Sequence, residues 1–186
     1  MPPQQAVSRK AAAAATRTNL IESGLRLAER TGLAGLSVNL LVDEAGVSKG
    51  SFFHHFGDRA SYLLALHREF HDSIAERIDQ AMGEWPPGGE RLMAGARVYL
   101  DICLQQRGIR ALLLEARAEP AVAEEIIRRN ADFAAKCKTD FDALARRHPL
   151  QSAQLWVAMT AEAALIELAN GAEVASIRAA LQEYLG

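Results

Sequence analysis

The residues best suited to chemistry in this chain lie between Ser48 and His55. Lys49 can donate hydrogen bonds to guanine acceptors or to phosphate, and Ser51 can donate to either of them. Gly50 lets another molecule approach the backbone closely. An ordinary solvent-exposed helix face carries the same residue types. The composition of this run therefore leaves two interpretations open, a nucleic-acid contact and a solvated surface.

The stretch SVNLLVDEAGVSKGSFFHHFGDR must position these side chains, and its pattern predicts two short helices around a turn. We expect Ser37 to N-cap a first helix that ends near Glu44. Gly46 suits a left-handed turn, after which Ser48 can cap a second helix that ends near His55. This arrangement is typical of a helix-turn-helix.

The string AGVSKGSFFHHF, with Arg17 and Leu20-Ile21 upstream, resembles the DNA-binding domain of the tetracycline-repressor (TetR) family of bacterial transcriptional regulators. The resemblance covers about residues 16 to 63, and beyond that point only the helical layout is similar. Phe53 stands where the family usually has a tyrosine, so it lacks the hydroxyl expected to reach phosphate. Arg59 stands where a lysine is usual.

By this resemblance, the start of the second helix would enter the major groove of DNA. His55 and Arg59 would hold phosphates, and the capped helix ends at Ser37 and Ser48 would face the DNA backbone. Asn39 would either read a base edge or remain a solvated polar residue. The candidate DNA-binding residues are Arg17, Ser37, Asn39, Ser48, Lys49, Gly50, Ser51, Phe53, His54, His55 and Arg59.

The composition fits a globular protein, because 49% of the 186 residues are hydrophobic and 24% are charged. Residues 1 to 60 hold seven Lys and Arg against five Asp and Glu, whereas the remainder holds fourteen against eighteen. The slightly basic part therefore contains the helix-turn-helix. Two cysteines are too few for a disulfide framework, and neither a signal sequence nor an apolar span of about 20 residues is present. We expect a cytoplasmic protein.

Proline, glycine and capping residues divide the chain into about nine helices and no strand, which predicts an all-α fold. Residues 1–15 are expected to form a flexible basic tail, from which Arg9 or Lys10 would reach a DNA groove or remain in solvent. Residues 16–60 would form the DNA-binding domain, and residues 61–186 a ligand-binding and dimerisation domain. The predicted helices outside the helix-turn-helix cover residues 16–30, 58–82, 90–106, 110–118, 120–147, 150–170 and 174–185.

The resemblance also implies a small-molecule pocket in the C-terminal part, because regulators of this family couple ligand binding there to release of DNA. Three predicted helices each offer residues that share one face. For each residue, plain core packing is the alternative. The candidate ligand-binding residues are Tyr99 and Cys103, then Asn130, Phe133, Cys137 and Phe141, and finally Trp156 and Met159.

Other chemistries have weaker support. Cys103 and Cys137 would form a redox switch only if they were close in space. His67 and His71 have the i, i+4 spacing of two metal ligands on a helix, but no third ligand is identifiable. Neither a nucleophile with its base nor a phosphate-binding glycine loop is present, so we expect no enzyme, no metal and no other cofactor.

The last two predicted helices are rich in alanine, which allows two helices to approach closely. In the TetR family the equivalent helices pair with their twins, and a two-fold dimer matches a palindromic operator. The alternative is that these helices close the core of the monomer. The sequence thus predicts a homodimeric, ligand-responsive repressor that binds double-stranded DNA. A helical ligand-binding or interaction module without a DNA role is the alternative.

Overall fold

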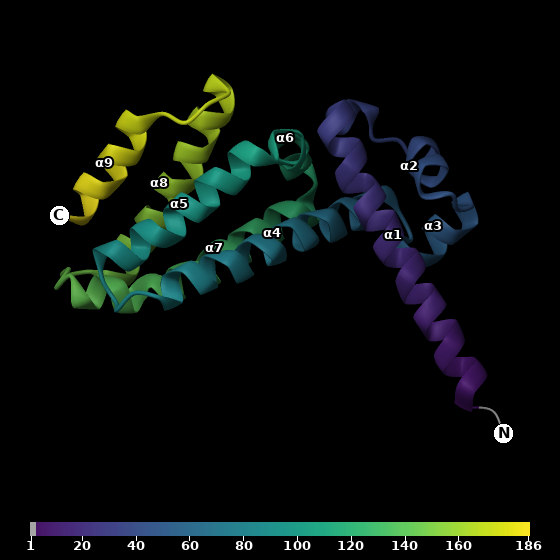
Figure 1. Ribbon diagram of the computed structural model, residues 1–186, viewed down its shortest axis with the longest axis horizontal. Helices are drawn as coiled ribbons and strands as arrows, with labels where there is room; N and C mark the ends of the chain where they lie inside the picture. The colour runs from purple at the N-terminus through teal and green to yellow at the C-terminus, as the bar shows by residue number, and fades with distance from the viewer. Residues whose placement is uncertain (1–2) are drawn as a thin grey trace. The chain divides into compact units, whose positions relative to one another are not determined.

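The computed structural model describes residues 3–186, and it describes the side chains of residues 9–31 and 36–186. Over these residues the chain forms nine α-helices and one 3-10 turn and no strand, so the predicted all-α fold is confirmed. Figure 1 shows the order of the helices along the chain. Their bounds are α1 Pro3–Gly35, α2 Val38–Ala45, α3 Lys49–Phe56, α4 Arg59–Gly83, α5 Gly89–Gln105, α6 Arg107–Glu115, η1 Ala116–Ala118, α7 Pro120–Ala143, α8 Pro149–Asn170 and α9 Ala175–Leu185.

The chain divides into two compact units. Residues 1–69 and 108–122 form the N-terminal unit, and residues 70–107 and 123–186 form the C-terminal unit. This division differs from the predicted boundary near residue 60, because α6 packs with the N-terminal helices. The side chain of Glu29 in α1 accepts hydrogen bonds from the first amides of α6, at 3.1 Å from Gly108 N and 3.1 Å from Ile109 N. A carboxylate at a helix N-terminus satisfies amides that have no partner within the helix.

The predicted caps of the helix-turn-helix are confirmed. The Ser37 hydroxyl accepts a hydrogen bond from Leu40 N at 3.2 Å, and the Ser48 hydroxyl accepts one from Ser51 N at 3.1 Å. Gly46 ends α2 in the left-handed region with φ 64°. This conformation places the start of α3 without strain, since glycine has no Cβ.

The first helix is longer than the sequence predicted. Instead of a flexible tail over residues 1–15, α1 already begins at Pro3, and it continues through Gly32 to Gly35. The run Ala11 to Ala15 explains the early part, because alanine has the highest helix propensity. Gly32 does not end the helix, since a helical glycine costs only about 1 kcal/mol and packing can offset this.

The core of the N-terminal unit is aromatic. Phe52 and Phe56 lie on the buried side of α3 with their ring centroids 5.5 Å apart, and both contact the ring of Tyr62. The Tyr62 hydroxyl donates to Leu20 O at 2.8 Å. Burial raises the pKa of Tyr62 well above its ordinary value, so this hydroxyl remains a donor. Val38 and Val47 are half-buried, and the side chain of Leu33 lies outside the described residues.

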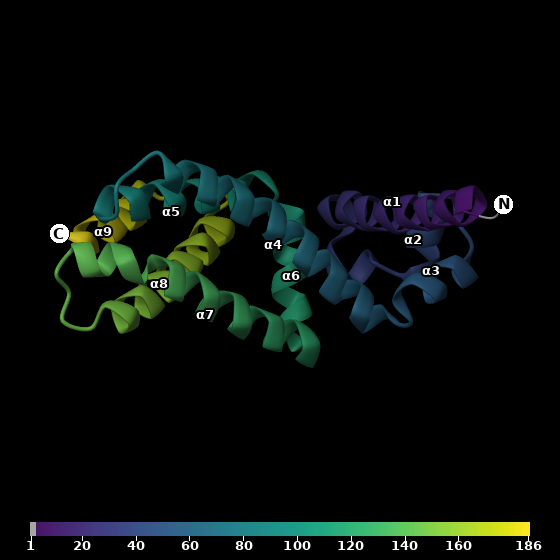
Figure 2. The same ribbon diagram turned by 90° about the horizontal axis from the view of Figure 1, so that it is seen from below.

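In the C-terminal unit, α5 packs against α8 and α9, as Figure 2 shows from below. A buried ion pair links the last two helices. The Glu167 carboxylate accepts from Arg178 Nε at 2.8 Å and Nη2 at 3.0 Å, and from Val174 N at 3.1 Å. These bonds position α9 beside α8.

Candidate functional site

Helix α3 presents one polar face to solvent. Phe52 and Phe56 point into the core, whereas the side chains of Lys49, Phe53 and His54 are exposed. The large exposed ring of Phe53 is unusual for a small domain, and it contacts Phe52 edge-on at 5.3 Å between centroids. A helix with a buried aromatic side and an outward basic side is suited to groove binding.

Three contacts from α1 hold α2 and its turn. The Asn19 amide donates to Ala45 O at 2.8 Å, which satisfies a carbonyl at the end of α2. Arg30 Nη2 lies 2.7 Å from the Glu44 carboxylate, and Arg26 Nε lies 3.6 Å from it. These charges lower the pKa of Glu44, with the hydrogen bond from Arg30 as the largest cause. The orientation of α3 is therefore set by helices on its inner side.

Two arginines lie near α3 in space or in sequence, Arg17 in α1 and Arg59 at the start of α4. The Arg17 guanidinium lies 5.2 Å above the Phe56 ring, a cation–π contact that holds it near α3. Burial lowers the pKa of His55, and the nearby charges of His54 and Arg17 lower it further. Arg59 Nη1 lies 3.9 Å from Glu119, which is a weak ion pair.

All eleven predicted DNA-binding residues lie in the N-terminal unit, and each is exposed or half-buried. Arg17 comes from α1, Arg59 from the start of α4, and the others from α2, α3 and their caps. The structure thus leaves the whole predicted set accessible. Their contacts with DNA remain a prediction.

A pocket of about 320 Å³ lies in the C-terminal unit, between α4, α5, α7 and α8. Of the predicted ligand-binding residues, Tyr99, Asn130, Phe133 and Trp156 line it. The other four do not, because Cys103, Cys137 and Phe141 are buried in the core and Met159 lies elsewhere on α8. The remaining lining residues are His71, Asp72, Ile74, Ala75, Ile78, Gly95, Ala96, Arg128, Arg129, Asp132, Lys136, Val157, Thr160 and Ala161.

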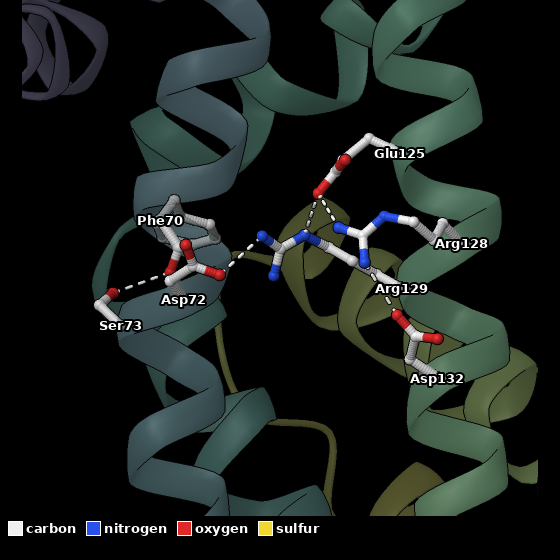
Figure 3. A network of polar contacts seen from close by, with 7 residues as sticks. All are labelled: Phe70, Asp72, Ser73, Glu125, Arg128, Arg129 and Asp132. Carbon is white, nitrogen blue, oxygen red and sulfur yellow. Dashed lines mark hydrogen bonds and ion pairs between the residues drawn. The ribbon is translucent and has the colours of Figure 1, made fainter.

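Sequence reasoning missed the charged residues of the pocket, which form ion pairs between α4 and α7. Figure 3 shows Arg129 between two carboxylates, with its Nη2 2.6 Å from Asp72 and its Nε 2.8 Å from Glu125. Seven residues further along each helix, Lys136 Nζ lies 2.7 Å from Asp79. The seven-residue spacing of opposite charges was a signal that could have paired these helices.

Comparison with known proteins finds a family match in the N-terminal unit. Residues 20–66 match the family model described as bacterial regulatory proteins, tetR family. This segment is similar to the TetR family. The match contains α2, α3 and the first part of α4, and it begins with the buried Leu20.

Two proteins that are similar over this part of the chain are transcriptional regulators. The repressor AcnR of Corynebacterium efficiens is 35% identical over 65 residues, which is 35% of each chain. The regulator AcuR of Cereibacter sphaeroides is 35% identical over 63 residues, 34% of this chain and 29% of AcuR. The chain therefore matches about a third of the length of these curated relatives.

The similarity of fold extends beyond residues 20–66. A transcriptional regulator of Rhodococcus sp. Rha1 superposes with a TM-score of 0.80 at 20% identity and covers 91% of this chain and 94% of its own. The multidrug binding protein EbrR, complexed with imidazole, gives a TM-score of 0.74 at 21% identity and covers the same shares. RolR, complexed with resorcinol, gives 0.68 at 17% identity and covers 95% and 90%. At these identities the likeness shows the fold alone.

Neither Cys103 nor Cys137 lines the pocket of the C-terminal unit. Burial raises the pKa of the Cys137 thiol to about 12, and the Asp140 charge adds to the effect. Within residues whose side chains are described, no group of three His, Cys, Asp or Glu is placed to hold a metal ion. No helix among the described residues is long and apolar enough to span a membrane.

Proposed function

We propose that this chain is a DNA-binding transcriptional repressor, which binds a palindromic operator as a homodimer and releases it when a small molecule occupies the C-terminal pocket. The observation that carries the proposal is the capped helix-turn-helix with an exposed basic α3 face, inside the segment that matches the TetR-family model. The names of AcnR and AcuR support it.

The exposed face of α3 suggests roles for its side chains. Lys49 and Ser51 lie in the first turn, where they can reach base edges, and the amides at the start of the helix can face a phosphate. Arg17 and Arg59 flank the helix and suit phosphate contacts. Phe53 can contact a thymine methyl group or a sugar, which replaces the tyrosine contact usual in this family.

A homodimer through α8 and α9 is supported by what these helices leave exposed. Leu155 is largely exposed on α8, and exposed alanines continue the same small-residue surface at Ala158, Ala179 and Ala180. Trp156, Ala163 and Leu181 are buried inside the unit. Only part of the surface of α8 and α9 is therefore available to a second copy.

Coupling between ligand and DNA would pass along α4, which runs without interruption from the N-terminal unit into the C-terminal unit. The pocket takes residues His71 to Ile78 from the second half of this helix. A ligand can shift the protein between a DNA-competent and an incompetent form only if it binds the two with unequal affinity. Operator affinity must then fall when the pocket is filled.

The DNA role is tested by fluorescence anisotropy with DNA that flanks the coding region of the protein. We expect affinity to fall steeply with salt, and Lys49→Ala to weaken binding. If Lys49 reads a base, the substitution reduces the discrimination against a wrong base at one operator position by about 1–3 kcal/mol. If Lys49 contacts phosphate, binding to all DNA sequences weakens alike. Lys138→Ala on α7 is the matched control. Equal binding by both variants would contradict this role of α3, and absence of any binding would favour a module without a DNA role.

The dimer is tested by light scattering after size exclusion. Leu155→Glu should give a monomer with weakened operator binding, because a charge would be buried in the interface. Ile127→Glu is the matched control, since Ile127 is a largely exposed apolar residue on α7. If the Leu155→Glu protein stays dimeric, the dimer interface lies elsewhere on the molecule.

A further inference from the structure

Arg129 has two carboxylate partners that differ in exposure. Its own side chain is 20% exposed and lines the pocket. Its Nε donates to Glu125, whose side chain is 3% exposed, whereas its Nη2 donates to Asp72, whose side chain is 65% exposed. The buried Glu125 is held in place, whereas the exposed Asp72 can be replaced at Arg129 by water or by a ligand. A planar guanidinium can donate hydrogen bonds to another carboxylate in place of Asp72.

The exposed carboxylates of this cluster can be exchanged for another anion. Glu125 accepts from two guanidiniums, because Arg128 Nη2 also lies 2.6 Å from it. The buried carboxylate thus balances one of two positive charges, and the other is shared by Asp72 and by Asp132, which is 67% exposed. An entering anion can displace either aspartate into water without leaving a buried charge unpaired. A cationic ligand has no such exchange available at Arg129.

Apolar and aromatic side chains also line the pocket, beside polar ones such as Asn130 and Thr160. Tyr99, Phe133 and Trp156 supply rings, and Ile74 and Ile78 are buried. The volume of about 320 Å³ is at the lower end of the range for small-molecule sites. It therefore suits a body of one or two rings.

From these three observations we propose that the pocket binds small aromatic monocarboxylates, whose carboxylate replaces Asp72 as the partner of Arg129. The inference rests on the proposed function, since it names the ligand class of the pocket that would regulate DNA binding. Displacement of Asp72 removes one of the two ion pairs described above between α4 and α7. The pair between Lys136 and Asp79 remains.

The proposal is tested by calorimetry on the full chain without DNA. Benzoate, phenylacetate and 2-naphthoate are compared with their carboxamides, which have the same shape and no charge. We expect at least one carboxylate to bind about ten- to a hundredfold more tightly than its amide. Arg129→Gln should abolish this preference. Lys138→Gln should keep it, because Lys138 pairs with Asp142 on the same helix outside the pocket.

Asp72→Asn provides a second arm that does not depend on the folding of Arg129→Gln. Removal of the competing aspartate should tighten carboxylate binding several-fold and leave amide binding unchanged. The proposal is overturned if none of the three carboxylates binds, if amides bind equally well, or if Asp72→Asn leaves carboxylate affinity unchanged.

Operator binding is measured in parallel on the same proteins. Intact operator binding without carboxylate binding would overturn the ligand class alone. Carboxylate binding without any operator binding would support the ligand class and refute the DNA function. The two proposals can therefore fail separately.

Discussion

Gly24→Ala should destabilise the N-terminal unit even though alanine favours helices. Gly24 lies within α1, where a Cβ atom would overlap the Tyr62 hydroxyl oxygen and would lie 3.0 Å from Tyr62 Cζ and 3.1 Å from Leu66 Cδ2. The Tyr62 side chain is buried and donates to Leu20 O at 2.8 Å. The added methyl group must therefore push the tyrosine away from its acceptor.

The expected loss follows from three contributions. Overpacking costs about 1–3 kcal/mol, and a broken buried hydrogen bond costs about 1 kcal/mol. The higher helix propensity of alanine returns about 1 kcal/mol. We expect a net destabilisation of about 2 kcal/mol, measured by urea unfolding followed by circular dichroism, as a lower midpoint at an unchanged slope.

A double-mutant cycle with Tyr62→Phe isolates the cause. Without the hydroxyl, Gly24→Ala should cost less than half as much, since the overlapping atom is gone. Gly83→Ala at the end of α4 is the control, because a Cβ there meets nothing within 4 Å. If Gly24→Ala stabilises the protein, or costs as much in the Tyr62→Phe background, the steric explanation is refuted.

Three further predictions concern titratable groups. Operator affinity should rise as pH falls below 6.5, because phosphate favours the charged ring of His55, whose pKa in the free protein is lowered by burial, His54 and Arg17. Anisotropy with His55→Gln should show a flatter pH profile of operator affinity. An unchanged profile would exclude a contact between His55 and phosphate. Burial raises the pKa of Glu167, but hydrogen bonds from Arg178 and Val174 outweigh burial and hold the pKa below 4.5. The ionised Glu167 therefore stabilises the folded protein above pH 4.5, and this contribution is lost as pH falls. Arg178→Ala should cost about 3 kcal/mol in urea unfolding at pH 7 and less at pH 4, and equal midpoints would contradict a stabilising pair. Cys137, with its pKa raised to about 12 by burial and Asp140, should react with a thiol reagent at pH 8 far more slowly in the folded than in the unfolded protein, whereas equal rates would show an accessible thiolate.

Local signals made the helix-turn-helix predictable. Ser37, Gly46 and Ser48 act on amides and carbonyls within four residues, so their roles can be read without knowledge of the rest of the chain. The sequence predicts too short a first helix, because Gly32 suggests a helix end near residue 30. The helix continues through it to Gly35.

Long-range packing limited the rest. The sequence spacing of Phe133 and Cys137 correctly placed them on one helix, but it could not show that the cavity reaches only the first of them. The assignment of α6 to the N-terminal unit depends on Glu29, which is 79 residues away from Gly108. Such contacts leave no periodic pattern in the sequence.

The two ion pairs between α4 and α7 also determine the register of these helices. Asp72 pairs with Arg129, and Asp79 pairs with Lys136, so both helices run in the same direction. A slip of one helical turn, three or four residues, would bring Asp72 opposite Glu125 in one direction and Asp132 in the other. Both alternatives oppose like charges. The helices can therefore separate when a pair is broken, but they are discouraged from sliding into a new alignment.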